Sequence, residues 1–321
     1  MKILITGAAG FIGFHLCKKL IEKKKYVIGI DNLNNYYSVK LKKDRIKILK
    51  ENKFSKYFKF KKLDLKNKKN LNVFCVKNKI DVIIHLAAQA GIRYSLQNPR
   101  NYLDNNVNGL FNLMEVAREN KIKKFIFASS SSIYGSNKKA PFKENFDTSS
   151  PLQFYGATKK AGEVFLKTYS HLYDMPVTCL RFFTVYGPWG RPDMAIFSFT
   201  KNIISKKKIN IFNRGKLIRD FTYIDDIIDG IIKSLKNKNK GFNIYNLGNQ
   251  SPIKLMYLIK LLEVNLKRKA KIIFSDFKKT EMNKTHSSNA KAYKDLKYKP
   301  KIKIEKGLKR FTQWYLRYYE K

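Results

Sequence analysis

Three glycines that directly follow a short apolar run constrain the fold of this chain more than any other feature. Residues 2–6 read as a β-strand, and Gly7, Gly10 and Gly13 come next, where a helix would begin. In such a turn the first glycine permits the tight bend, the second lets a pyrophosphate approach the backbone, and the third allows close helix packing. The spacing is GxxGxxG rather than the GxGxxG of the general dinucleotide fingerprint, so the triplet alone is a weak signal.

Short apolar runs alternate with amphipathic stretches through the first half of the chain, and this alternation predicts a parallel sheet covered by helices. The expected strands are residues 2–6, 26–31, 56–63, 82–85, 124–129 and 177–181. Beyond residue 181 the pattern is irregular, with a loop at 187–193 and a helix through 197–205. We therefore expect a dinucleotide-binding domain over residues 1–181 and a partly interleaved substrate domain over 182–321.

The composition indicates which general classes of protein the chain can belong to. The chain has 321 residues, 44% of them hydrophobic and 14% aromatic, which is enough for a large core. It contains no uninterrupted apolar run of about 18 residues, so we expect no membrane-spanning helix. Cys17, Cys75 and Cys179 lie far apart and lack metal-ligand spacing, so we expect neither a disulfide framework nor a metal site, and a cytoplasmic location.

The formal net charge of +43 raises nucleic acid or an anionic membrane as a partner. Lysines are spread along the whole chain, however, beside many Asn, Ile, Tyr and Phe residues, which indicates a general composition bias rather than a dedicated basic surface. We expect no specific nucleic-acid partner and no membrane partner. A nucleic-acid binder that exploits this charge remains the alternative.

A carboxylate follows the second expected strand. Asp31 stands at the right distance from the glycine turn to accept hydrogen bonds from the adenosine ribose hydroxyls, although a turn or helix-cap role is the alternative. Asn32 and Leu33 offer no cation for a 2′-phosphate, which favours NAD over NADP. Residues after the third and fourth strands that could also meet the cofactor are Asp64, Leu65, Ala87 and Ala88, although small residues there are often only packing.

Two further patterns could supply acid–base chemistry. Tyr155 and Lys159 stand at i and i+4, so on a helix both side chains project from one face. A free phenol has a pKa of about 10, and a neighbouring ammonium with a cationic nicotinamide would favour its phenolate, a usable base for a carbinol. The serine run 129–132 ends the fifth strand at the edge where open α/β sheets bind ligands. Each pattern alone is common, but together with the glycine turn they make coincidence improbable.

At this point the chain resembles the extended short-chain dehydrogenase/reductase family, the NAD-dependent epimerases and dehydratases. The motifs TGAAGFIG, HLAAQAGIR, ASSSSIYG and YGATK occur in the family's order, and the resemblance covers essentially the whole chain. The stretches DNLNNYYSVKLKKDRI, LAAQAGIRYS and LRFFTVYGPWGRPDMA are similar to the bacterial UDP-glucuronate 4-epimerases. The resemblance implies an α/β fold of the Rossmann type, a doubly wound parallel sheet with a smaller mixed α/β C-terminal substrate domain, together with bound NAD, a UDP-sugar substrate and a homodimer.

The resemblance also implies roles for individual residues. Ser130, Tyr155 and Lys159 would be catalytic. NAD would be held by Gly7, Gly10, Phe11, Ile12, Gly13, Asp31, Asn32, Asp64, Leu65, Leu86, Ala87, Ala88, Gln89, Asn106 and Ser129, with Tyr155 and Lys159. The substrate would contact Arg93, Ser130, Ser131, Ser132, Tyr155, Thr184, Arg191 and Arg219, the last two at the diphosphate, where a fork of donors suits phosphate oxygens. Surface positions are the alternative reading for these two arginines.

The implied reaction removes the C4 hydride of the sugar to NAD with proton loss to Tyr155, rotates the 4-keto sugar and returns the hydride to its other face. Relatives that dehydrate or decarboxylate carry an acidic residue after the catalytic hydroxyl, and here Ser131 and Ser132 follow it. A UDP-hexose epimerase, a dehydratase or decarboxylase, and a non-catalytic dinucleotide-binding regulator remain alternatives. The segment Glu281-Met-Asn-Lys284-Thr285 departs from the family's QPGDV-like pattern and leaves recognition of the base and ribose open.

Overall fold

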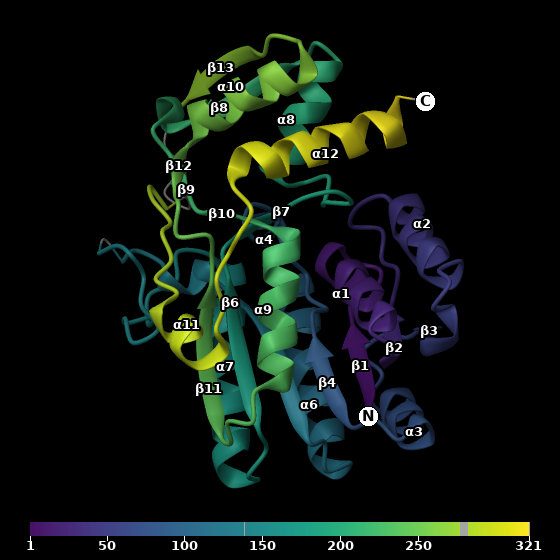
Figure 1. Cartoon of the computed structure of the whole chain (residues 1–321). Coiled ribbons are helices and arrows are strands. Elements are labelled where there is room, and N and C mark those ends of the chain that lie inside the picture. The colour runs from purple at the N-terminus through teal and green to yellow at the C-terminus, as the bar shows by residue number, and fades with distance from the viewer. Residues whose placement is uncertain (138, 277–281, 321) are drawn as a thin grey trace.

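A parallel sheet of seven strands runs through the middle of the molecule, with the order β11-β6-β5-β4-β1-β2-β3 (Figure 1). The structure is a computed structural model that describes residues 1–137, 139–276 and 282–320. The strands are β1 (Lys2–Thr6), β2 (Tyr26–Asp31), β3 (Phe58–Lys62), β4 (Val82–His85), β5 (Lys124–Ser130), β6 (Val177–Phe182) and β11 (Phe242–Leu247). The chain winds one way from β1 to β3 and the other way from β4, so a topological switch point lies between β1 and β4. This confirms the expected doubly wound α/β fold.

The burial of each strand follows its place in the sheet. β4, β5 and β6 are buried along their whole length because helices cover both faces. β3 is the edge strand beside β2, and its Lys59, Lys61 and Lys62 are exposed. Charged side chains on an edge strand discourage pairing with another chain. β3 is shorter than the expected strand 56–63, because residues before it form a 3-10 turn, η1 (Ser55–Tyr57).

Two helical layers cover the sheet and make two separate cores. On one face α1 (Phe11–Glu22) and α9 (Ile224–Lys236) pack together, with α2 (Val39–Lys50) beside α1, over Ile3, Ile5 and Ile84. On the other face lie α3 (Lys68–Asn78), α6 (Gly109–Glu119) and α7 (Phe154–Leu172), over Leu4 and Phe125. Alternate side chains of β1 therefore enter opposite cores, as the period of a strand requires.

The cap lies over the carboxyl ends of the strands, at the top of Figure 1. It is built from short paired strands, β7 (Thr184–Tyr186) with β10 (Phe221–Tyr223), β9 (Ile218–Arg219) with β12 (Ile253–Lys254), and β8 (Lys208–Phe212) with β13 (Lys271–Ser275). Its helices are α8 (Ala195–Ile204), α10 (Leu255–Leu266) and α12 (Ile304–Tyr319). α8 begins and ends close to the expected helix 197–205.

The chain beyond residue 181 contributes to both the cap and the sheet layer. β11 pairs with β6 over six residues, and α9 packs on the sheet, although both come from the second half of the chain. α11 (Ala290–Leu296) also lies against β11. The connections on the sheet side are short elements: α4 (Tyr94–Gln97), α5 (Pro99–Tyr102), a π-helical turn η2 (Leu103–Asn108) and the 3-10 turn η3 (Ser131–Tyr134). A further 3-10 turn, η4 (Asn213–Gly215), follows β8 in the cap.

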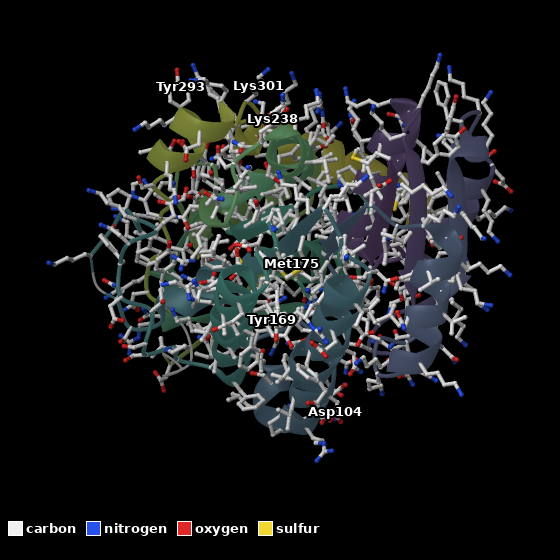
Figure 2. All side chains as sticks on the ribbon, turned by 90° about the horizontal axis from the view of Figure 1, so that it is seen from below. Asp104, Tyr169, Met175, Lys238, Tyr293 and Lys301 are labelled. Carbon is white, nitrogen blue, oxygen red and sulfur yellow. The ribbon has the colours of Figure 1, made fainter. Side chains whose placement is uncertain are left out.

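Two findings bear on the expected partners. Within the described ranges, no helix combines the length and the apolar content that crossing a bilayer requires. Figure 2, which views the molecule from below, shows side-chain nitrogens along most of its outline. The positive charge is therefore distributed over the surface, as the even spread of lysines along the sequence predicts.

Candidate active site

A cavity of about 700 Å³ lies between the carboxyl ends of the strands and the cap. Its size falls within the range of small-molecule sites in proteins. It is lined by nearly all of the residues singled out from the sequence: Gly7, Gly10, Phe11, Ile12, Gly13, Asp31, Asn32, Asp64, Leu65, Leu86, Ala87, Ala88, Gln89, Arg93, Ser129, Ser130, Ser131, Ser132, Tyr155, Lys159, Thr184, Arg191 and Arg219. The fold thus brings together residues that the chain separates by more than 200 positions.

The glycine turn has the shape that a pyrophosphate needs. Gly7 has a φ of +71°, and a Cβ there would lie 2.8 Å from the backbone nitrogen of Ala87. A Cβ on Gly13 would lie 2.1 Å from the carbonyl oxygen of Gly7. Helix α1 starts after Gly10, no described side chain caps it, and its first turn holds no acidic residue. The free amides of that first turn, beside the cavity, fit a bound anion.

Asp31 is held at the end of β2 by the glycine turn itself. Its carboxylate accepts hydrogen bonds from the backbone nitrogens of Ala9, at 3.1 Å, and Leu33, at 2.8 Å. Burial raises the pKa of Asp31, and these two hydrogen bonds and the charge of Lys42 act in the opposite direction. Lys42 reaches the cavity from α2 and donates to the carbonyl and side-chain oxygens of Asn34, both at 2.7 Å. A cation therefore stands near Asp31, although its sequence neighbours supply none.

The loops after β3 and β4 form the wall of the cofactor end. Asn32 donates to the carboxylate of Asp64 at 3.1 Å and joins the loop after β2 to the loop after β3. The backbone of Gln89 exchanges two hydrogen bonds with the side chain of Asn106, at 2.8 and 3.0 Å. Asn106 is buried in η2 and does not line the cavity, so the structure places it behind the wall, where it positions Gln89.

The three expected catalytic side chains meet at the end of β5. Tyr155 lies in the first turn of α7 and forms a hydrogen bond with the Ser130 hydroxyl. The Ser130 hydroxyl donates to the Ser132 hydroxyl and accepts from the Ser132 backbone nitrogen, both at 3.1 Å. One helical turn after Tyr155, the Lys159 ammonium donates to the carbonyl oxygen of Ala128 at 2.8 Å. A phenol, an ammonium and a hydroxyl thus share one corner of the cavity.

Burial shifts the pKa values of Tyr155 and Lys159 so that the uncharged form of each side chain is favoured. It raises the pKa of Tyr155, while the charge of Arg191 and the hydrogen bond with Ser130 lower it. Burial also lowers the pKa of Lys159 from 10.5 to about 7, and the Glu163 carboxylate acts in the opposite direction. In the protein without a bound cofactor, burial therefore outweighs these two opposing contributions at Tyr155. A bound nicotinamide cation would supply the additional positive charge that favours the phenolate.

The cap side of the cavity is rich in arginine. The Arg191 guanidinium forms an ion pair with Asp193, its Nε at 3.1 Å, and Asp193 also accepts from the Tyr36 hydroxyl at 3.2 Å. The Arg191 side chain is 20% exposed, which argues against a free surface arginine. Arg93 stacks over the Phe212 ring at 4.3 Å, and this contact joins the sheet side to the cap.

Thr184 and Arg219 complete the cap side from its short strands. Thr184 begins β7, and its backbone nitrogen donates to the carbonyl oxygen of Asp220 at 3.2 Å. The Arg219 guanidinium, at the end of β9, donates to the carbonyl oxygen of Ile218 at 3.0 Å. Both residues line the cavity.

Comparison with known proteins decides which family this site belongs to. A model of the NAD-dependent epimerase/dehydratase family matches residues 3–248. The chain belongs to this family. Membership confirms the resemblance drawn from the motifs, and the family's cofactor, NAD, fits the glycine turn and the Asp31 carboxylate described above.

Individual members of the family match over the whole chain. Protein CapI from Staphylococcus aureus is 45% identical, with 100% of both chains covered. A UDP-glucuronate 4-epimerase from Thermodesulfobacterium geofontis is 45% identical over 97% of this chain and 95% of its own. A crystal structure of a UDP-glucuronic acid 4-epimerase from Bacillus cereus, in complex with UDP-glucuronic acid and NAD, superposes with a TM-score of 0.93. It is 35% identical and covers 99% of this chain and 100% of that one.

The segment that departs from the family's pattern does not face the cavity where the structure describes it. Glu281 lies outside the described residues. Lys284 is exposed, pairs through a backbone bridge with Ile218, and does not line the cavity. Thr285 is buried, and its hydroxyl accepts from the backbone nitrogen of Asp220 at 3.1 Å. Within the described ranges no group of three or more His, Cys, Asp or Glu side chains could hold a metal ion.

The sequence analysis did not identify several residues that contribute to the site of this member of the epimerase/dehydratase family. Glu163 and Arg181 form a buried ion pair beneath β5, and the Ser129 hydroxyl donates to Glu163 at 2.6 Å. Tyr36 lines the cavity through the loop that follows β2. Glu163 could have been found from spacing, because it follows Lys159 by one helical turn. Tyr36 gives no such signal, because only the fold brings its loop to the cavity.

Proposed function

We propose that this protein is an NAD-dependent 4-epimerase of a UDP-sugar, and that it converts UDP-glucuronate to UDP-galacturonate. The observation that carries the proposal is the meeting of Ser130, Tyr155 and Lys159 in one cavity with the glycine turn. The UDP-glucuronate 4-epimerases named above, similar over nearly the whole chain, support the same reaction. A silent dinucleotide-binding regulator would need none of these three side chains.

The chain's own residues would hold and move the proton of the sugar's C4 hydroxyl. Ser130 would hold that hydroxyl by a hydrogen bond, and the Oη of Tyr155 would take its proton and later return it. Lys159 would hold positive charge beneath Tyr155 and favour its phenolate. NAD, when bound along the glycine turn, supplies the exchange of hydride with C4 and is regenerated in each turnover.

The polar side chains that line the cavity with these groups suit a uronic acid. We assign Ser131, Ser132 and Thr184 to the sugar and its carboxylate, and Arg191 and Arg219 to the diphosphate. All five line the cavity. Because hydroxyls rather than carboxylates follow Ser130, the site lacks the acid or base that dehydration and decarboxylation require at that position. This favours epimerisation among the possible fates of a 4-keto sugar.

The decisive experiment is incubation of the purified protein with UDP-glucuronate, without added cofactor, followed by NMR of the anomeric protons. We expect signals of UDP-galacturonate to appear. Tyr155→Phe should abolish the product. Tyr169→Phe, a change on the same helix as Tyr155 that removes a hydroxyl bound to Glu115 of α6, should leave the product unchanged. Conversion of UDP-glucose alone would point to a hexose epimerase, and a UDP-pentose or a dehydrated sugar would overturn the proposal.

We also propose that the protein acts as a homodimer in the cytoplasm. The outward faces of α6 and α7 carry large exposed apolar side chains, namely Phe111, Val164, Phe165, Leu172 and Tyr173. Several large exposed apolar side chains on two neighbouring helices suit an interface between two copies. Three buried free cysteines are consistent with a reducing compartment.

A further inference from the structure

A buried arginine on α2 joins the glycine turn to the cap. Arg45 is 0% exposed. Its Nη1 donates to the carbonyl oxygen of Ala9 and to the Tyr37 hydroxyl, both at 2.8 Å. Its Nη2 donates to the carbonyl oxygens of Trp189, at 2.6 Å, and Gly190, at 3.3 Å. One guanidinium thus bridges two segments that lie about 180 positions apart in the chain.

On the sheet side, Arg45 contacts the same turn that fits the pyrophosphate. Ala9 lies between Gly7 and Gly10, and its backbone is held from two directions. Its nitrogen donates to Asp31 at 3.1 Å, and its carbonyl oxygen accepts from Arg45. The position of the Ala9 backbone therefore determines the positions of both the Asp31 carboxylate and the Arg45 guanidinium.

On the cap side, Arg45 holds a backbone segment in an unfavourable conformation. Trp189 has a φ of +61°, which is uncommon for a bulky residue and persists only where the surroundings fix it. Its ring packs against Phe14 and Trp314, with ring centroids 5.6 and 5.3 Å apart. His15 on α1 lies 2.9 Å from the carbonyl oxygen of Pro188 and gives a second tie to the segment. Arg191 follows this segment directly.

We propose that Arg45 is a positioning residue that couples cofactor binding at the glycine turn to the order of cap residues 188–191. All four hydrogen-bond acceptors of its guanidinium are neutral oxygens, so its buried N–H groups keep their partners only while those oxygens stay in place. A cofactor that fixes the Ala9 peptide fixes Arg45, and Arg45 then fixes the carbonyls of Trp189 and Gly190. The same linkage keeps the cofactor bound, because coupling between two sites is reciprocal.

The inference rests on the proposed use of NAD and can be tested without any turnover. Arg45→Met removes the bridge, and Arg45→Lys keeps the charge but has no fork to reach both segments. Lys43→Met, an exposed lysine on the same helix, is the matched control. We expect NAD to dissociate about tenfold to a hundredfold faster from both Arg45 variants, as suits the loss of charged hydrogen bonds, and at the wild-type rate from the control.

Hydrogen exchange measures the coupling itself. In the wild type, added NAD should slow exchange in residues 188–191 as well as in the glycine turn, by about tenfold. In the Arg45 variants the slowing should remain at the turn and be lost at 188–191. Equal protection of 188–191 in variant and wild type, or no effect of NAD on this segment in the wild type, would overturn the inference. A wild-type protein that binds no NAD would instead overturn the proposed function.

Discussion

Glu163 and Arg181 form a bidentate ion pair inside the protein, with nitrogen–oxygen distances of 2.8 and 2.9 Å and side-chain exposures of 3% and 2%. The pair joins α7 to β6 beneath the end of β5, where the Ser129 hydroxyl donates to Glu163. Because Lys159 precedes Glu163 by one helical turn, the pair also fixes the height of the Lys159 ammonium over the sheet. A buried ion pair therefore underlies the corner of the cavity that holds Ser130, Tyr155 and Lys159.

Removing one partner of this pair should strongly destabilise the protein. Glu163→Gln leaves the Arg181 charge buried without its counter-ion, which costs about 3–5 kcal/mol. Glu119→Gln, which removes a surface ion pair with Lys68, should cost less than about 1 kcal/mol. Urea unfolding followed by circular dichroism measures both. A loss at Glu163 as small as that at Glu119 would show that the buried pair contributes little.

The depressed pKa of Lys159 should appear as a pH dependence of stability. Burial lowers this pKa from 10.5 to about 7, so between these values the unfolded chain binds a proton that the folded protein does not. The penalty is complete below pH 7 and is lost as the pH rises toward 10.5, so the free energy of unfolding increases with pH in this window. From pH 7 to pH 9 the nucleotide-free wild type should gain about 2 kcal/mol relative to Lys159→Met.

The control for this titration is Lys167→Met, an exposed lysine on the same helix. Its free energy of unfolding should follow that of the wild type between pH 7 and pH 9. Parallel curves for the wild type and Lys159→Met would show that Lys159 keeps its charge in the folded protein.

Thr184 should restrain the carboxylate of the keto intermediate. A 4-keto uronate is a β-keto acid, and loss of carbon dioxide from it requires a particular orientation of the carboxylate. Thr184→Val removes one hydroxyl, and we expect the fraction of UDP-pentose among the products to rise by about tenfold, as loss of a hydrogen bond to a charged group allows. Thr178→Val, the same change in buried β6, should leave the ratio unchanged. An unchanged ratio for Thr184→Val would remove this role.

Asp31 should account for the preference for NAD over NADP. A 2′-phosphate next to its carboxylate is repelled, and Lys42 cannot compensate while it is bound to Asn34. Asp31→Asn should weaken NAD binding and improve NADP binding, so that the ratio of their Kd values changes by about tenfold. Titration calorimetry measures both constants. Asp64→Asn, a change at the neighbouring loop, should alter the ratio little, and equal effects of the two substitutions would contradict the assignment.

The apolar face of α6 and α7 should hold two copies together. Phe165→Glu places a charge in the proposed interface, and we expect the protein to become monomeric by light scattering after gel filtration. Val73→Glu, at a more exposed apolar position on α3, is the control and should leave the dimer intact. A wild-type protein that is monomeric at micromolar concentration would remove the proposal.

The sequence predicts β1, β2 and β4 well because a short, mostly apolar run marks each of them. The bounds of β1, β2 and β4 agree with the expected ranges to the residue. β11 was not foreseen, because its sequence FNIYNL mixes amides with apolar residues and lies far from its partner β6 in the chain. Local pattern carries no information about such a distant pairing.

The lining of the cavity was predictable for a similar reason, because motif residues follow directly on predicted strands. The groups behind the lining were predictable only in part, because the spacing of Glu163 from Lys159 places both on one helix face but does not indicate a buried ion pair. Arg45 and Glu163 are charged, and charged side chains are ordinarily exposed, so only their tertiary partners explain their burial. Lys42 likewise approaches Asp31 only because α2 folds back beside the glycine turn.

The late return of the chain to the sheet has a consequence for the protein's synthesis. β6 is buried along its length by β5 and β11, yet about 60 residues separate its end from the start of β11. At ordinary ribosomal speeds this stretch takes about 3 to 12 seconds to make. During that time the nascent chain presents an apolar strand with an open side, which is a template for wrong association. Chaperone capture is therefore expected at this stage of translation.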